Sequence, residues 1–289
     1  MNPQPPAPTC VRHPNRPTGL ACTRCGRPAC PDCLQPAAVG QHCVDCVRAS
    51  GRQVRPVRTV AGAPVAKSAT PLVTYGLIAL NILFFGITAA QAGSVVDNFR
   101  SELFLRWALV PTLVADGEWF RVIGSGFLHW GPLHLALNMF ALYIVGIQLE
   151  PVLGRVRMLS IYLVSLIGGS AAGLLLEPVN TVGAGASGAV YGMFGAIAVT
   201  MFRLRMNPTQ ILVIIGINVL LSLSIPGVSL WVHLGGLLAG TSATLGVLFV
   251  PQWVGAKSQE SARTIGWVSI GVVGLASAAA IAAAAMMIG

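Results

Sequence analysis

The sequence predicts an all-α polytopic membrane protein: a bundle of six transmembrane helices with one extra C-terminal transmembrane helix, preceded by a small zinc-binding domain. Of its 289 residues, 54% are hydrophobic and only 9% are charged, which is unlike the composition of soluble domains. Several apolar stretches reach the roughly twenty residues that cross a bilayer. All seven cysteines precede residue 47, so the cysteine-rich part and the membrane part are expected to be separate domains.

The net charge of +9 does not indicate a nucleic-acid partner, because the chain shows no basic helix and no alternation of basic and aromatic residues. Much of the positive charge lies in arginine or lysine pairs just outside the apolar stretches, where it sets membrane topology. The expected partner of this surface is therefore the lipid bilayer.

Residues 10–46 carry four pairs of candidate metal ligands, and two residues separate the members of each pair. The pairs are Cys10 and His13, Cys22 and Cys25, Cys30 and Cys33, and Cys43 and Cys46. Eight ligands at this spacing predict two structural zinc ions in tetrahedral sites. One zinc ion or disulfides are the alternatives, but the odd number of cysteines and a reducing, cytosolic location argue against disulfides. His42 is a ninth candidate ligand, and the proline-rich residues 1–9 are expected to be disordered.

This spacing resembles that of a B-box-type zinc finger, with a final cysteine pair where that family often has histidines. The resemblance implies that alternate pairs share an ion. One ion would be held by Cys10, His13, Cys30 and Cys33, and the other by Cys22, Cys25, Cys43 and Cys46. It also implies that the domain binds a protein partner or only stabilises the fold.

Seven apolar spans follow a basic linker, residues 47–70. Their expected ranges are about 72–91, 131–149, 158–177, 187–202, 209–225, 231–250 and 265–288. Arginine or lysine follows the second, fourth and sixth spans, whereas the loops after the third and fifth have neither. The positive-inside rule therefore places the N-terminus in the cytoplasm and the C-terminus outside. The composition is typical of a GC-rich bacterial genome, which indicates the bacterial plasma membrane.

Two further segments have an expected role in the membrane. Residues 93–128 mix charged residues with tryptophan and phenylalanine, which predicts a loop lying in the membrane interface. The last span has no ionisable residue and is expected to be an appended packing helix. Glu150, near Arg155 at the cytoplasmic end of the second span, is expected to form an ion pair or to cap a loop.

Polar residues stand at the starts of the second, fourth and sixth spans, which all run from outside to inside. These residues are His134 and Asn138, Ser187, and His233. Polar groups are rare in membrane segments and usually face a bundle interior or water. Because they come from three helices at one depth, the sequence predicts a shared site below the external surface.

The spacing of small residues suggests how this site is assembled. Ser187 and Tyr191 share a helix face, and so do His134 and Asn138. Glycines on the fourth and sixth spans allow the helices to approach until Ser187 and His233 can hydrogen-bond. A serine needs such a base to become a nucleophile, and the absence of a carboxylate at that depth predicts a Ser–His dyad. The alternatives are a helix cap for the serine, a structural hydrogen-bonded pair for His134 and Asn138, and core packing for Tyr191.

The membrane part, over roughly residues 70–250, resembles the rhomboid intramembrane serine proteases. The matching motifs are Gly185-Ala186-Ser187-Gly188 with Tyr191, His134-x3-Asn138, His233-x2-Gly236-x3-Gly240, Gly146-x3-Glu150-x3-Gly154, Trp119 with Arg121, and His129. In the interfacial motif the family more usually has adjacent tryptophan and arginine, whereas Phe120 separates them here.

The resemblance implies a protease core at residues 71–250, followed by a loop and a seventh helix at 251–289. It implies that Ser187 is the nucleophile, His233 the general base and Tyr191 its support, with His134 and Asn138 lining the oxyanion site. The substrates implied are membrane proteins cleaved in or near a transmembrane segment, and no cofactor is expected for catalysis. The alternatives are a catalytically inactive rhomboid-like protein that binds membrane clients, and a small-solute transporter.

Overall fold

The computed structural model describes residues 6–53, 58–62, 70–225 and 227–289. It divides the chain into two units, Met1–Val57 and Arg58–Gly289. The first five residues of the expected tail lie outside the described residues, and so do residues 54–57 and 63–69 of the expected linker.

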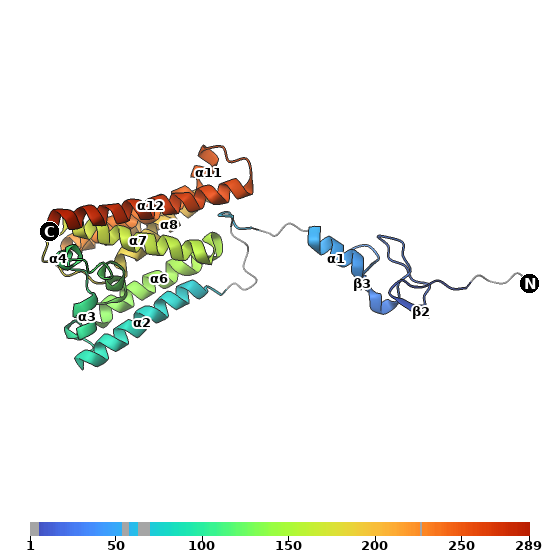
Figure 1. Ribbon diagram of the computed structural model, residues 1–289, viewed down its shortest axis with the longest axis horizontal. Coiled ribbons are helices and arrows are strands. Elements are labelled where there is room, and N and C mark those ends of the chain that lie inside the picture. Colours follow the sequence, from blue (N-terminus) through green and yellow to red (C-terminus); the bar gives the residue numbers. More distant parts are fainter. Residues whose placement is uncertain (1–5, 54–57, 63–69, 226) are drawn as a thin grey trace, which may run out of the picture. The chain divides into compact units, whose positions relative to one another are not determined.

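The N-terminal unit is built from two short antiparallel hairpins and one helix (Figure 1). The elements are β1 (Thr9–Cys10), β2 (His13–Pro17), η1 (Pro31–Cys33), β3 (Leu34–Pro36), β4 (Gln41–Cys43) and α1 (Val44–Gln53). Thr9 therefore belongs to a strand, although the sequence assigned it to a disordered tail. Residues 47–53, assigned to the linker, continue the helix that carries Cys46 in its first turn.

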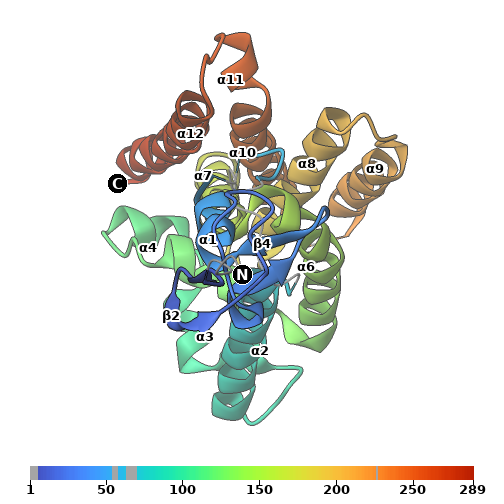
Figure 2. The same cartoon turned by 90° about the vertical axis from the view of Figure 1, so that its right-hand side faces the viewer.

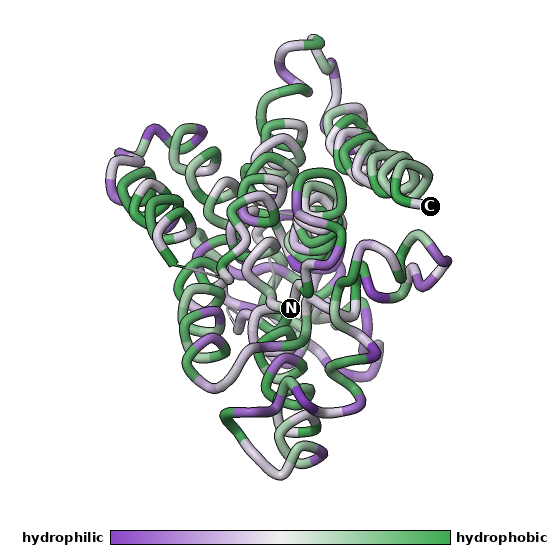
Figure 3. The backbone as a smooth tube through the Cα atoms, turned by 90° about the vertical axis from the view of Figure 1, so that its left-hand side faces the viewer, coloured by the Kyte–Doolittle hydropathy of each residue, from purple (hydrophilic) through white to green (hydrophobic). Residues whose placement is uncertain are grey.

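The described residues of the membrane unit form seven apolar helices of 16 residues or more, on which hydrophobic residues predominate (Figure 3). They are α2 (Leu72–Ala92), α6 (Gly131–Leu153), α7 (Arg155–Leu176), α8 (Ser187–Arg203), α9 (Thr209–Ser224), α10 (Leu230–Leu248) and α12 (Gln259–Ile288). A short helix, α11 (Val250–Trp253), follows α10. This arrangement agrees with the expected all-α polytopic membrane fold.

Five of the seven helices, α2, α6, α7, α10 and α12, are long and apolar enough to cross a membrane by length and composition. The other two helices are shorter, with 17 residues in α8 and 16 in α9, close to their expected ranges. At 1.5 Å per residue, α8 is about 26 Å long, less than a typical hydrocarbon core. Residues 188–200 of α8 are all buried against other helices, so this helix does not need to span lipid.

The interfacial segment between α2 and α6 consists of short helices rather than an irregular loop. They are η2 (Asn98–Arg100), α3 (Glu102–Trp107), α4 (Pro111–Ala115), α5 (Arg121–Gly124) and η3 (Ser125–Phe127). The buried Arg121 holds them together, because its guanidinium donates to the carbonyls of Leu105 and Ala108 and pairs with Glu118 at 2.7 Å. Trp119 and Phe120 remain exposed, as expected of side chains in the membrane interface.

Glu150 connects the C-terminal end of α6 to the beginning of α2. Its buried carboxylate accepts hydrogen bonds from the backbone N–H groups of Val73 and Thr74 and from the Thr74 hydroxyl, at 2.9–3.0 Å. Arg155 lies 3.6 Å away. A carboxylate at this position satisfies N–H groups that have no partner within the helix and interacts favourably with the helix dipole. Glu150 is thus both an ion-pair and a capping residue.

Glycines allow α7, α8 and α10 to pack backbone against backbone. A Cβ atom at Gly236 would overlap the carbonyl oxygen of Gly188, and one at Gly240 would overlap that of Gly192. Gly188 is thus paired with Gly236, and Gly192 with Gly240, which means that α8 and α10 run parallel along a glycine seam. Their N-terminal ends therefore lie side by side. On the other face of this seam, a Cβ at Gly169 of α7 would lie 2.8 Å from the Val232 carbonyl oxygen.

The Gly236→Ala variant is expected to be destabilised by about 1–3 kcal/mol or more, because the new methyl group must push the two backbones apart. Gly271→Ala is the matched control, since a Cβ at this α12 position meets nothing within 4 Å. Alanine is favoured over glycine in helices, so the control should be unchanged or slightly more stable. Denaturation in detergent measures both, and equal stabilities of the two variants would contradict the close packing.

Helix α12 packs along α7 and α10. A Cβ at Gly274 would contact Val164, and a Cβ at Gly246 of α10 would press against the Ser269 side chain. Toward the N-terminal end of α12, the Trp267 ring lies 5.4 Å from the guanidinium carbon of Arg157. The last helix is therefore an appended packing helix, and it begins at Gln259 rather than near residue 265 because Ser258 caps it.

Candidate active site and metal sites

The loop that leads into α8 is fixed by the interfacial segment. Gly183 exchanges two backbone hydrogen bonds of 2.8 Å with Leu109, and the Gly185 N–H donates to the Ser125 carbonyl. Gly185 has φ +141°, a conformation that L side chains rarely adopt. A Cβ there would lie 3.1 Å from His134 Nε2 and 3.6 Å from Ser187 Oγ. Because Gly185 has no side chain, a small space stays open there, and both the serine hydroxyl and the His134 ring border it.

His134 presents a donor nitrogen to this space. Its Nδ1 accepts a hydrogen bond of 3.2 Å from the Trp130 N–H, so in the neutral ring the proton is on Nε2. Nε2 is the nitrogen that lies against Gly185. Asn138, one turn further along α6, donates one amide hydrogen to the His134 carbonyl at 2.9 Å and retains a second.

Ser187 is the first residue of α8 and is half-buried. The first N–H groups of a helix have no partner within it, so the N–H groups of Ser187 and Gly188 are available to an anion at this end. Ser187 Oγ and His233 are not hydrogen-bonded to each other in the described part of the structure. Catalytic hydrogen bonds often tighten only once substrate is bound.

His233 lies in the first turn of α10, where a ring contact and the cap of its helix both constrain its position. Its ring stacks on Tyr191 of α8, with the centroids 4.0 Å apart and the planes 10° from parallel. The start of α10 is set by Ser229, which accepts from the Val232 N–H and donates to Glu177 at 2.6 Å. Because Gly188 and Gly236 are in contact, His233 and Ser187 lie at the same end of the α8–α10 seam.

His129 is close to the site but belongs to a different environment. It is fully buried before the start of α6, and its ring meets the His134 ring edge-on at 5.1 Å. Burial lowers the pKa of His129 to about 3, so the ring is neutral at physiological pH. Neither ring nitrogen makes a well-formed hydrogen bond with the described residues. This is consistent with its omission from the predicted dyad.

Ser222 of α9 was not predicted from the sequence. It is buried, and its Oγ lies 2.7 Å from His233 Nδ1 and 3.1 Å from the Tyr191 hydroxyl. One signal was present: the fifth span runs from inside to outside, so a serine near its end has the same depth as polar residues at the starts of the fourth and sixth spans. Serine is common in apolar helices, however, where its hydroxyl bonds to the carbonyl four residues earlier.

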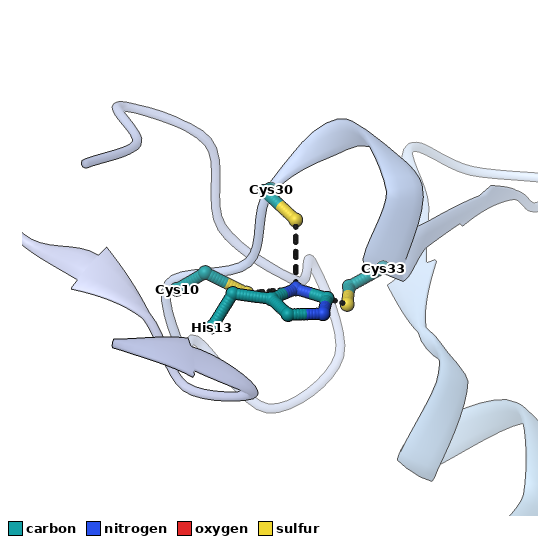
Figure 4. Close-up of side chains that lie close together, drawn as sticks. All are labelled: Cys10, His13, Cys30 and Cys33. Atoms are coloured by element: carbon teal, nitrogen blue, oxygen red, sulfur yellow. Dashed lines mark hydrogen bonds between the residues drawn. The ribbon is translucent and has the colours of Figure 1, made fainter. Parts of the chain in front are cut away.

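The N-terminal unit places the eight candidate ligands in two groups. One consists of Cys10, His13, Cys30 and Cys33 (Figure 4), and the other of Cys22, Cys25, Cys43 and Cys46. This is the grouping that the B-box resemblance implies. The seven sulfurs form no disulfide. His42 lies on β4 opposite Gln35, outside both groups.

The distances within each group fit a tetrahedral metal ion. Zn–S and Zn–N bonds of about 2.3 and 2.0 Å imply S···S and S···N separations of about 3.8 and 3.5 Å. His13 Nδ1 lies 3.4 Å from the sulfurs of Cys30 and Cys33 and 3.8 Å from that of Cys10. In the second group, the sulfurs of Cys25 and Cys43 are 3.8 Å apart. Both groups could therefore bind a metal ion.

Hydrogen bonds to the sulfurs support the same conclusion. The Cys43 N–H donates to Cys22 Sγ at 3.1 Å, and Arg27 Nε donates to Cys25 Sγ at 3.5 Å. Such donors stabilise thiolates, the form in which cysteine binds a metal.

The membrane unit is an integral, polytopic helical bundle with a serine, two histidines, an asparagine and a stacked tyrosine near the N-terminal ends of α6, α8 and α10. The family model described as "Rhomboid domain" matches residues 116–250, which include all five of these membrane-site candidates. The chain belongs to the rhomboid family. Residues 116–250 leave out α2, α12 and the N-terminal unit.

Several curated relatives have similar sequences. The chain is 37% identical over 193 residues to rhomboid protease GluP of Bacillus subtilis, covering 64% of this chain and 37% of that protein. It is 35% identical over 153 residues to RHOMBOID-like protein 5 of Arabidopsis thaliana, covering half of each chain. It is 29% identical over 207 residues to rhomboid protease AarA of Providencia stuartii, covering 62% of this chain and 73% of AarA. The first two relatives are thus matched over half of their length or less.

Proposed function

We propose that this protein is an intramembrane serine protease that hydrolyses peptide bonds in or near transmembrane segments of other membrane proteins. The observation that carries the proposal is the geometry of His233, which stacks on Tyr191 at the same end of the α8–α10 seam as Ser187. The relatives named rhomboid proteases GluP and AarA support the same activity.

In this proposal, Ser187 Oγ attacks the scissile carbonyl carbon while its proton passes to His233 Nε2. The electron pair of the carbonyl moves onto its oxygen, and the oxyanion accepts hydrogen bonds from His134 Nε2–H, the Asn138 amide and the N–H groups at the start of α8. His233 then gives its proton to the amine nitrogen as the C–N bond breaks. A water molecule releases the acyl group by the same steps.

The site is proposed to open to the outside, with the N-terminus in the cytoplasm. Arginines lie at one membrane face, at Arg155, Arg203 and Arg205, and this face is the cytoplasmic one by the positive-inside rule. Ser187 and His233 begin helices that end near that face, so they lie toward the opposite one. The bacterial plasma membrane remains the expected location.

The two metal ions are proposed to be structural Zn²⁺, held by the two groups of ligands in the N-terminal unit. Zinc suits four-coordinate sites made of cysteine and histidine. The ions would supply cross-links between the hairpins, whereas the protease reaction would need none. The unit itself is proposed to stabilise the chain or to bind a protein partner.

The proposed function is tested by reaction with a fluorophosphonate probe that labels activated serines. Wild type should label, and Ser187→Ala and His233→Ala should not. In vesicles of known orientation, a membrane-impermeant form of the probe should label only from the external side. If the folded wild-type protein neither labels nor cleaves a transmembrane reporter, the protein is instead a client-binding relative without protease activity.

A further inference from the structure

The helix α9 contributes one buried polar side chain to the site region, that of Ser222. Among the described residues of α9, only Ile211 and Ser222 are buried, and the helix lies at the edge of the bundle beside α8 (Figure 2). Ser222 is also the α9 residue whose side chain hydrogen-bonds to α8 and α10 in the described structure, through Tyr191 and His233. The contact is therefore specific to this serine.

The hydrogen bonds around Ser222 are compatible with a proton on Nδ1 of His233. A serine hydroxyl has one hydrogen to donate and two lone pairs to accept. The Ser222 hydrogen is directed to the Asn218 carbonyl, 2.8 Å away on the same helix. Its two lone pairs then accept from the Tyr191 O–H and from the His233 Nδ1–H, so all three groups are satisfied.

With the proton on Nδ1, Nε2 of the neutral ring has a free lone pair. This is the tautomer that a general base needs in order to take the proton of a serine with Nε2. Tyr191 and Ser222 also constrain the ring differently, because stacking fixes its plane whereas the hydrogen bond to Nδ1 fixes its rotation within that plane.

We propose that Ser222 is a positioning residue for His233: it accepts the Nδ1–H bond and thereby holds the imidazole in the tautomer and rotation in which Nε2 acts as the base. This inference rests on the proposed protease function. It extends the predicted Ser–His dyad by a neutral third member that comes from another helix. A hydroxyl avoids the cost of burying a carboxylate at membrane depth.

The experiment compares rates of fluorophosphonate labelling for wild type, Ser222→Ala, Ser222→Thr and Ser224→Ala in detergent. Ser224 is the matched control, because it is an exposed serine of the same helix that donates to its own i−4 carbonyl and, in the described structure, hydrogen-bonds to neither Tyr191 nor His233. Ser222→Ala should label about 10- to 100-fold more slowly than wild type. This loss of rate lies between that expected for losing an ordinary hydrogen bond and that expected for the wrong histidine tautomer. The probe concentration giving half the maximal rate should not change.

The threonine variant retains the hydroxyl and should recover most of the rate, and Ser224→Ala should match wild type. A wild-type rate in Ser222→Ala would overturn the inference, and so would a threonine variant that is folded but as slow as the alanine variant. If wild type does not label at all, the proposed function fails and the inference fails with it, which is a distinguishable result.

A second measurement does not depend on activity. In ¹⁵N-histidine-labelled protein, the His233 signals, assigned by their loss in His233→Ala, should show a proton on Nδ1 in wild type and in Ser222→Thr. In Ser222→Ala, the two tautomers should be mixed. A wild-type ring protonated on Nε2 would overturn the inference.

Discussion

Turnover of a transmembrane reporter in proteoliposomes is expected to fall by about 10³- to 10⁶-fold in both Ser187→Ala and His233→Ala. The two losses should be similar, because a nucleophile without its base and a base without its nucleophile are equally unable to form the acyl-enzyme. For the same reason, the double variant should be no worse than either single variant. This non-additivity separates a catalytic unit from two residues that act independently.

Two further variants accompany this prediction: a control serine far from the site, and the tyrosine whose ring stacks on His233. Ser160→Ala removes a hydroxyl that donates to its own helix carbonyl at the opposite end of α7, and turnover should not change. Tyr191→Ala removes the ring stacked on His233 and should give an intermediate loss, since the base remains but is less well oriented. Wild-type turnover in folded Ser187→Ala would exclude this serine as the nucleophile.

The positions of the catalytic candidates could be predicted from the sequence because each depends on local spacing. Ser187 and Tyr191 lie on one helix face at i,i+4, and His233 and Gly236 follow the glycine seam of their helix. The metal ligands are equally local, because a pair such as Cys22 and Cys25 specifies its own geometry. The assignment of pairs to ions followed only from a resemblance.

The role of Ser222 could not be predicted in this way, because it depends on how α9 is rotated relative to α8 and α10. No periodicity identifies the buried face of a helix whose residues are apolar on every side. The interfacial segment was predicted to be a loop for a related reason. Its short helices are held by one long-range group, the guanidinium of Arg121, which bonds to carbonyls 13 and 16 residues earlier.

Removal of the metal ions is expected to unfold the N-terminal unit while the membrane unit stays folded. The buried core of the described N-terminal residues contains no large apolar side chain. It consists of Cys10, Cys22, Ala29, Cys30, Cys33 and Cys43. Structural zinc binding contributes about 10–16 kcal/mol at neutral pH, which is comparable to or larger than the whole stability of a small domain.

The measurement is hydrogen exchange on the full chain before and after chelation, together with the metal content by elemental analysis. Exchange should rise to unfolded rates over residues 6–53 and remain slow in α7, α8 and α10, and the untreated protein should contain two zinc ions per chain. Cys43→Ser should lose the ion of its own group. His42→Ala, which alters the histidine outside both groups, should retain both ions. Unchanged protection of residues 6–53 after complete metal loss would contradict this prediction, because it would show that the hairpins are stable without the ions. So small an apolar core is not expected to fold alone.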